Sequence, residues 1–301
     1  MDAPLIWSTA DLQTLKGWGP AEIRRAVREG RLLRLRRGTF TEATGLSPAA
    51  EHRARVRAAL RTLGDSTVIS HASAAVLQGL PVQRALLQQV WVTRAKGSGG
   101  CTATLRATRA PVPPDERTTV AGITMTSVAR IVADLARTVP FEWGVAAADA
   151  ALRQGTELAS LEATLASGAR RPGQRRARRV VGFADAGSES AGESLSRATF
   201  LLQHLPIPHV QFEVRTASGA FVARGDFGWE EQGVIGEFDG ALKYDGLDGR
   251  RPADVVMAEK EREQALRDEG WWIVRWGWRE LSRPAALAER IRRAFGHAVR
   301  R

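Results

Sequence analysis

Three acidic side chains in the C-terminal third of the sequence have the types and spacing of a divalent-metal site. Asp226 lies in the apolar run 221–229, and Glu237 and Asp239 lie in the next run, 234–239. If the connection between these runs is a tight hairpin, Asp226 faces Glu237 across two neighbouring strands. Because side chains alternate along a strand, one face of the hairpin then carries all three acids. The opposite face is apolar and carries Phe227, Trp229, Val234 and Phe238.

Carboxylates that face each other on neighbouring strands repel, so this face requires positive charge nearby. A hard ion such as Mg²⁺ or Mn²⁺ meets that need, because it takes one or two carboxylates together with water and a phosphate oxygen. We expect Asp226 and Glu237 to be the metal ligands and Lys243 to orient an attacking water. The alternative is that the acids pair with nearby arginines, such as Arg224 or Arg251, on an exposed sheet face.

The segments around these acids predict a small domain with a mixed sheet and flanking helices. The run 188–204 begins with serine, carries acids such as Glu193 in its first turn and has apolar residues at helical spacing, which predicts a helix. A strand over 210–215 precedes the acidic strands. A helix over 254–269, a strand over 271–276 and a helix over 284–295 follow them.

The N-terminal segment combines two short helices with a basic ribbon. A helix that starts at Ser8 or Thr9 stops at Gly17, and Pro20 opens a second helix that Gly30 ends. The run 31–40 then alternates apolar and basic residues around a glycine, as in a two-stranded ribbon. This order predicts a winged helix-turn-helix, whose second helix enters the major groove while the ribbon contacts flanking phosphates.

The expected DNA contacts of this winged helix are arginines. They are Arg24, Arg25 and Arg28 in the second helix and Arg34, Arg36 and Arg37 in the ribbon. The alternative is an arginine-rich solvated helix followed by an ordinary hairpin, because the motif has modest specificity.

The middle of the chain predicts a mixed α/β domain in which no catalytic group stands out. Ser70 and His71 are neighbours in sequence, and neighbours rarely point at each other, so we expect both to have structural roles. The segment 168–179 holds six arginines and no acid. It predicts a linker that leads into a basic helix, either a solvated surface run or a contact with a phosphate backbone.

Composition agrees with a nucleic-acid partner. The 301 residues include 44 Lys+Arg against 33 Asp+Glu, for a net charge of +11. A GC-rich genome explains the choice of arginine over lysine but leaves the net positive charge unexplained. The single cysteine, the absence of a run of apolar residues that could span a bilayer and the absence of a secretory leader predict a soluble cytoplasmic protein with no membrane partner.

Two stretches resemble known families. The N-terminal two-thirds, with Arg31-Leu-Leu-Arg-Leu-Arg-Arg-Gly38, Ser70-His-Ala-Ser-Ala-Ala75 and Gly79-Leu-Pro81, resembles the AbiEi-type antitoxins of actinobacteria. This resemblance implies a DNA-binding winged helix, a repressor or phage-defence role and a possible toxin partner.

The C-terminal stretch resembles the Vsr-related branch of the PD-(D/E)xK nucleases. The likeness rests on Glu193-Ser-x-x-Arg197, Asp226-Phe, Glu237-Phe-Asp-Gly240-x-x-Lys243-Tyr and Gly270-Trp-Trp-Ile-Val-Arg275-Trp. It implies metal binding at Asp226 and Glu237, with Glu193 in support. The sequence departs from the plain motif because Asp239 stands where that motif has lysine, so Lys243 would substitute from a shifted position and Asp239 would lie in the outer shell.

We therefore expect a multidomain α+β protein in four parts. These are a winged helix over 1–45, an AbiEi-like α/β domain over 46–168, a basic linker and helix over 169–186, and an endonuclease-like domain over 187–301. The expected function is metal-dependent hydrolysis of phosphodiester bonds by a DNA-binding protein, in phage defence or DNA repair. The alternative is a non-catalytic transcriptional repressor or antitoxin.

Overall fold

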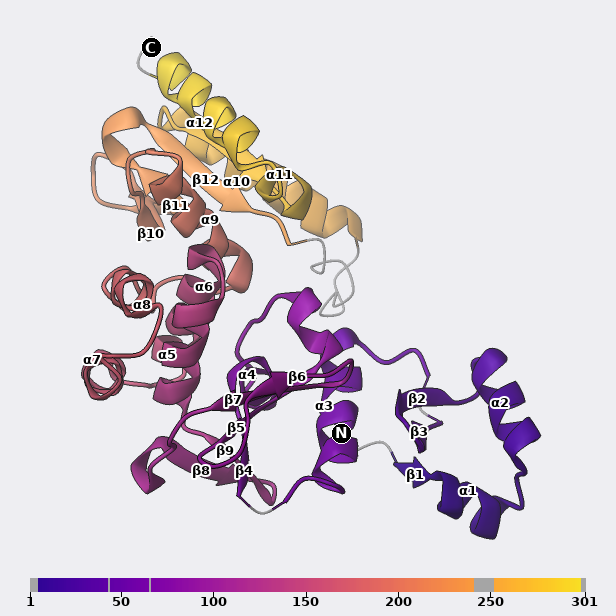
Figure 1. Ribbon diagram of the computed structural model, residues 1–301. Helices are drawn as coiled ribbons and strands as arrows, with labels where there is room; N and C mark the ends of the chain where they lie inside the picture. Colours follow the sequence, from indigo (N-terminus) through magenta and orange to yellow (C-terminus); the bar gives the residue numbers. More distant parts are fainter. Residues whose placement is uncertain (1–4, 43, 65, 241–251, 299–301) are drawn as a thin grey trace. The chain divides into compact units, whose positions relative to one another are not determined.

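The chain forms two compact units in a computed structural model, which describes residues 5–42, 44–64, 66–240 and 252–298. The first unit comprises residues 1–138 and 156–177, and the second comprises 139–155 and 178–301. Each unit is mixed α and β, as the sequence predicts (Figure 1). The expected boundary at residue 168 stays a prediction, but α6 (Phe141–Arg153) packs with α9 (Ala191–Leu202) in the second unit.

The first unit begins with the predicted helix, turn, helix and hairpin. These elements are β1 (Trp7–Ser8), α1 (Thr9–Lys16), α2 (Pro20–Arg28), β2 (Leu33–Arg36) and β3 (Thr39–Thr41). Gly17 ends α1 in the left-handed conformation, and Pro20 starts α2, so only three residues separate the helices. The strands form a small sheet in the order β1-β3-β2. Leu12, Ile23, Ala26, Leu32 and Phe40 form its core.

A six-stranded mixed sheet forms the rest of the first unit, in the order β6-β7-β5-β4-β9-β8. Its strands are β4 (Thr67–Ile69), β5 (Val90–Arg94), β6 (Gly100–Cys101), β7 (Leu105–Arg109), β8 (Arg117–Val120) and β9 (Ile123–Thr126). Its helices are α3 (Pro48–Leu60), α4 (His71–Leu77), α5 (Val128–Thr138) and α7 (Leu158–Ser167), with 3-10 turns at Arg84–Gln88 and Pro114–Glu116. Helix α8 (Gln174–Val181) crosses the division between the units.

The second unit contains a four-stranded mixed sheet in the order β10-β11-β12-β13. Its strands are β10 (His209–Arg215), β11 (Phe221–Trp229), β12 (Val234–Phe238) and β13 (Trp272–Trp276). The 3-10 turn Glu230–Gln232 joins β11 to β12, and β13 pairs parallel with β12. The other helices are α10 (Pro252–Asp268), α11 (Trp278–Leu281) and α12 (Pro284–Ala298).

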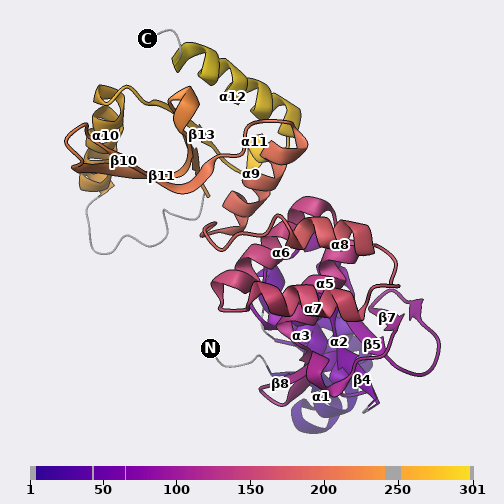
Figure 2. The ribbon, with the colours of Figure 1, turned by 90° about the vertical axis from the view of Figure 1, so that its left-hand side faces the viewer.

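The predicted register of the acidic hairpin is confirmed. Trp229 pairs with Val234 and Phe227 pairs with Gly236, where the printed pairing ends, and Asp226 and Glu237 are the next residues of the two strands. Helices α9 and α12 cover the face that carries Phe227, Trp229 and Phe238 (Figure 2).

The other face of the sheet carries apolar side chains in addition to the predicted acids. Val214, Ala223, Ile235 and Leu266 form a second apolar cluster there, and Leu266 comes from α10. The acids therefore lie beside a second core under α10. Asp239 follows the end of β12 and is exposed.

Candidate functional site

A row of polar side chains crosses all four strands of the C-terminal sheet. Gln211 lies between the pairs Val210–Phe227 and Phe212–Gly225, so it is opposite Asp226 on β11. Asp226 and Glu237 directly follow the last printed pair of β11 and β12, Phe227–Gly236, and Glu237 pairs directly with Arg275 on β13. The sequence predicts the two central acids of this row. From the sequence, Gln211 and Arg275 are not predicted as site residues. The strands predicted around them could have placed them next to the two acids.

Arginines occupy both carboxylate oxygens of Glu237. Arg275 Nε donates to Glu237 Oε2 at 2.7 Å, and an Nη atom of Arg262 donates to Glu237 Oε1. The side chain of Glu237 is only 13% exposed. Arg262 also bonds Glu259, at 3.1 Å and 3.0 Å, and Arg275 bonds Glu263 at 2.8 Å. The result is a network of acids and arginines that joins α10 to β12 and β13.

The carboxylates of this network keep its arginines charged. The hydrogen bond from Arg262 to Glu259, assisted by Glu237, raises the pKa of Arg262 above its ordinary value. Burial works to lower the pKa of Arg275, but hydrogen bonding and attraction to Glu237, with Glu259 and Glu263, raise it overall. Each guanidinium group is therefore a fixed positive charge beside Glu237.

This network supplies the positive charge that the sequence requires at the acidic face. The alternative interpretation named Arg224 or Arg251 as the partners, and for Glu237 the partners are instead Arg262 and Arg275. Arg224 pairs with Glu189 at 3.2 Å, and Arg251 lies outside the described residues. Repulsion between opposed carboxylates therefore no longer argues for a metal ion.

The other predicted acids have separate hydrogen bonds. Asp226 Oδ2 accepts from the backbone N–H of Phe238 at 2.8 Å. Glu193 is buried in the first turn of α9, where its Oε2 accepts from Glu189 N at 2.8 Å and from Gln211 Nε2 at 2.9 Å. Gln211 can reach this helix because its φ of 50° kinks β10 at that residue. Glu193 is thus connected to the polar row through Gln211.

The remaining predicted site residues lie apart from this arrangement. The backbone N–H of Asp239 donates to Trp276 O at 2.8 Å, which extends the parallel pairing of β12 and β13. Lys243, the expected helper of an attacking water, lies outside the described residues.

The arrangement does not fit a bound divalent ion as it stands. Among the described residues, His, Cys, Asp and Glu side chains form no group of three or more that could hold a metal ion. Mg²⁺ requires carboxylate oxygens that are open to it. A metal ion on Asp226 and Glu237 would have to displace Arg262 or Arg275 from Glu237.

The predicted DNA-contact arginines lie mainly on the surface of the winged helix. Arg24, Arg25 and Arg28 are exposed on α2, opposite the buried residues Ile23 and Ala26. Arg25 pairs with Glu29 at 2.6 Å. In the part of the chain that the structure describes, Arg24 and Arg28 form no ion pair.

The ribbon arginines differ in their surroundings. Arg34 and Arg37 are exposed, whereas Arg36 is half-buried. Arg36 donates to the carbonyl oxygens of Ala58 and Ala59 at 3.5 Å and 3.4 Å and to Thr62 Oγ1 at 2.6 Å. Arg36 therefore fixes the ribbon to α3, and its guanidinium is already bonded within the protein.

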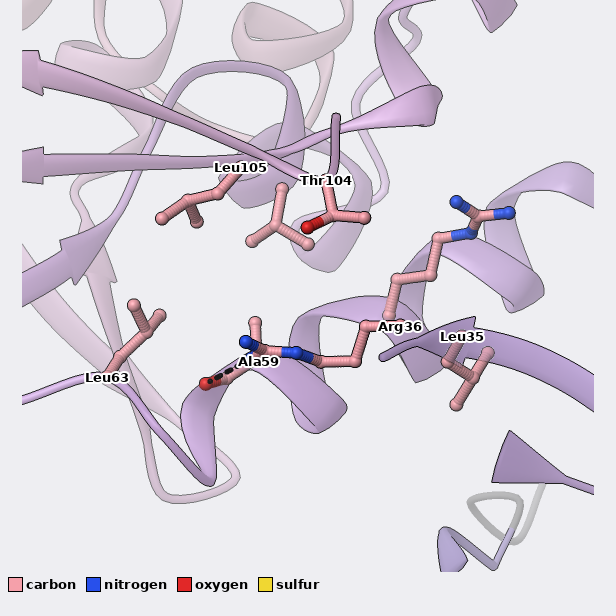
Figure 3. Close-up of a pocket in the computed structure, with 8 residues that line it drawn as sticks. Leu35, Arg36, Ala59, Leu63, Thr104 and Leu105 are labelled. Carbon is pink, nitrogen blue, oxygen red and sulfur yellow. Dashed lines mark hydrogen bonds between the residues drawn. The ribbon is translucent and has the colours of Figure 1, made fainter. Parts of the chain in front are cut away.

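Arg36 also lines a small pocket between the ribbon and the six-stranded sheet. Figure 3 shows Leu35, Ala59, Leu63 and Leu105 around it, with the bond from Arg36 to Ala59. The lining is mostly apolar. The pocket brings together no set of side chains suited to catalysis.

Ser70 and His71 are buried, but the expectation that these neighbours do not point at each other is wrong. His71 Nδ1 lies 2.9 Å from Ser70 Oγ, and the His71 ring stacks on Trp91 with centroids 5.4 Å apart. Thr93 Oγ1 donates to Ser70 Oγ at 2.8 Å. Burial lowers the pKa of His71, so the ring is neutral at ordinary pH.

Comparison with known proteins identifies two similar proteins and assigns the chain to no family. The sequence matches no family profile. It is 30% identical over 181 residues to "Uncharacterized protein MT2308" and "Uncharacterized protein Rv2248", from two strains of Mycobacterium tuberculosis. The match covers 60% of this chain and 64% of each relative. In the described part of the chain, no helix is both long and apolar enough to cross a membrane.

Proposed function

We propose that this chain is a DNA-binding protein that inserts α2 into the major groove of a duplex. The ribbon of β2 and β3 then contacts the flanking phosphates. The observation that carries this proposal is the exposed basic face of α2, where Arg24 and Arg28 lie one helical turn apart. Arginine reads guanine edges and phosphates through paired donors. We place this activity in the cytoplasm.

The short turn between the helices supports this role. Two helices joined by about three or four residues with glycine are typical of helix-turn-helix domains. Gly17, with φ of 68°, and Gly19 flank Trp18 in this turn. Arg36 holds the ribbon against α3 and the residues that follow it. Arg34 and Arg37 are exposed and can contact phosphates.

The role of the second unit is then regulatory or docking. This preference follows from Glu237, whose two oxygens already bond Arg262 and Arg275. A domain whose central acid is neutralised from within needs no metal ion to fold. The protein would act as a repressor or antitoxin, with a toxin as a possible partner for this unit.

The test of DNA binding is gel retardation of labelled duplex DNA over a range of salt concentrations. We expect retardation by the wild type, and a slope of log K against log salt that is smaller by about 1.8 in Arg24→Gln/Arg28→Gln, if each arginine neutralises one phosphate. If the arginines read bases instead, affinity falls and the preference among sequences relaxes. Arg283→Gln/Arg293→Gln removes the same charge from exposed positions of the second unit and is the matched control. Absence of retardation at low salt would refute the proposal.

A second candidate function is hydrolysis of DNA by the second unit. It is favoured by Asp226 and Glu237 on the neighbouring strands β11 and β12, and by Glu193, which accepts a hydrogen bond from Gln211 on β10. Nicking of supercoiled plasmid with Mg²⁺ or Mn²⁺, its loss with EDTA and its loss in Asp226→Asn/Glu237→Gln would establish it. If the protein retards DNA but does not cleave it with either metal, hydrolysis is refuted and the repressor or antitoxin role stands.

A further inference from the structure

Helix α8 carries an array of arginines on one face. Arg175, Arg176, Arg178 and Arg179 are exposed, whereas Ala177 and Val180 are buried. At 3.6 residues per turn, the four arginines span an arc of roughly 160°. The buried residues, with Val181, lie on the opposite arc. The helix is therefore strongly divided into a basic face and an apolar face.

On three other helices of this chain, an arginine pairs with an acid of the same helix. Arg55 pairs with Glu51 on α3, Arg267 pairs with Glu263 on α10, and Arg292 lies 3.6 Å from Glu289 on α12. These are the pairs that a solvated helix face normally carries.

Helix α8 has no such compensation in its own sequence. The segment 168–184 contains six arginines and neither aspartate nor glutamate. Within the described residues, Arg175 and Arg178 form no ion pair. Like charges three and four residues apart destabilise a helix. A polyanion bound along this face would remove that repulsion.

Packing holds this basic face in place. Gln174, the first residue of α8, accepts from Arg137 at 3.3 Å and 3.1 Å and donates to Leu165 O at 2.8 Å. The preceding Gly173 has φ of 80°, and a Cβ there would lie 2.4 Å from Arg137 O. Only glycine fits so close to α5. The start of the arginine array is thus fixed by contacts within the first unit.

We propose that α8 is a second DNA-contact element, which neutralises backbone phosphates through Arg175 and Arg178. The proposal rests on the proposed DNA-binding function. Arginine suits phosphate because its planar group donates two parallel hydrogen bonds. The helix rises about 1.5 Å per residue, so the two side chains leave it about 4.5 Å apart along the axis. This spacing is comparable to the rise of about 3.4 Å between phosphates of one strand.

The experiment is the salt dependence of duplex binding by the full chain carrying Arg175→Gln/Arg178→Gln. Glutamine keeps a long side chain and a good helix propensity, so α8 is retained. The slope of log K against log salt should fall by about 1.8, which corresponds to roughly a tenfold or greater loss of affinity near 0.1 M salt. The loss should be equal for duplexes of different sequence, because phosphate contacts read no bases.

Three controls separate the possible results. Circular dichroism and thermal melting check that the variant is folded, and Arg175→Lys/Arg178→Lys, which keeps the charge, should retain most of the slope. Arg283→Gln/Arg293→Gln should leave the slope nearly unchanged. Equal slopes for the α8 variant and this control would overturn the proposal while leaving the winged helix as the DNA-binding element. No binding by the wild type at low salt would overturn the proposed function and this inference with it.

Discussion

Glu237 is the residue whose removal tests the arginine network most directly. Glu237→Ala deletes two charge-assisted hydrogen bonds, one from Arg262 and one from Arg275. Each such bond contributes about 1.5–3 kcal/mol when desolvated. The arginine side chains are 28% and 35% exposed and keep Glu259 and Glu263 as partners, which lowers the expected total to about 2–3 kcal/mol.

Glutamine at the same position should cost less. Glu237→Gln preserves shape and one carbonyl oxygen, so it can still accept from one arginine, and we expect a loss of about 1 kcal/mol. Urea unfolding followed by tryptophan fluorescence measures both variants, because Trp229 and Trp276 are buried in the same unit.

The control for Glu237 is another glutamate of the same sheet. Glu213 is 49% exposed and pairs with Arg215 at 2.7 Å. Glu213→Ala should change stability by no more than about 1 kcal/mol, as is usual for exposed pairs. If Glu237→Ala costs no more than Glu213→Ala, the network is a solvent-screened surface pairing and our account of the site fails. A large loss would mean that nuclease assays should use Glu237→Gln, because Glu237→Ala would lose structure as well as chemistry.

Three further predictions concern buried groups. Burial lowers the pKa of His52 below 6.5, so the unfolded chain takes up a proton that the folded chain does not. Urea unfolding at about pH 7.5 and 5.5 should therefore show stability falling below about pH 6.5, by up to about 1.4 kcal/mol per pH unit from His52 and as much again from His71, whose pKa burial also lowers; an unchanged value would contradict this. A Cβ at Gly192 would lie 1.9 Å from the ring of Phe238, so Gly192→Ala should cost about 1–3 kcal/mol in a thermal melt, and a neutral result would mean that α9 can shift away. Arg197→Met strands the buried Asp149, which lies 2.9 Å from Arg197, and should cost about 3–5 kcal/mol in urea unfolding; an Asp149→Leu/Arg197→Met variant that is no more stable would argue against the ion pair as the cause.

The hydrogen bonds of the His52 ring show why the fold opposes its protonation. The backbone N–H of Trp91 donates to Ser73 Oγ at 2.7 Å, and Ser73 Oγ lies 2.8 Å from His52 Nε2. The other ring nitrogen lies 2.9 Å from Leu87 O. This chain of bonds requires a proton on Nδ1 and a lone pair on Nε2. A second ring proton would face the serine hydroxyl, whose oxygen already accepts from Trp91.

The sequence predicts the second unit well where local pattern determines structure. Alternation around Gly233 is enough to place Trp229 opposite Val234, and the apolar strand near Trp276 completes the mixed sheet as expected. These features depend on side-chain period and turn length, which are local properties.

The partners of Glu237 could not be predicted in the same way. Arg262 and Arg275 lie 25 and 38 residues farther along the chain, on a helix and on the last strand. Their approach depends on how α10 packs on the sheet, where its Leu266 joins the apolar cluster of Ile235, and this packing is a tertiary property. Sequence reasoning correctly required a cation at the acidic face but could not distinguish a metal ion from two guanidinium groups.

Arg36 illustrates the same limit in the winged helix. Its neighbours Arg34 and Arg37 are exposed, whereas Arg36 is half-buried. The sequence places all three in one basic run, whereas Ala58 and Ala59 of α3 and the nearby Thr62 bond Arg36. An Arg36 substitution would therefore weaken DNA binding by loosening the ribbon, even without a phosphate contact of its own.

The two candidate functions depend on different parts of the molecule, so neither experiment decides the other. DNA binding rests on Arg24 and Arg28, whose charge is uncompensated within the described part of the first unit. Hydrolysis rests on Asp226 and Glu237, and Glu237 is neutralised by Arg262 and Arg275. A metal ion that reached these acids would have to exchange two strong charge-assisted bonds for coordination. Of our two proposals we therefore favour a protein that binds duplex DNA without cutting it, because Arg262 and Arg275 already pair with Glu237.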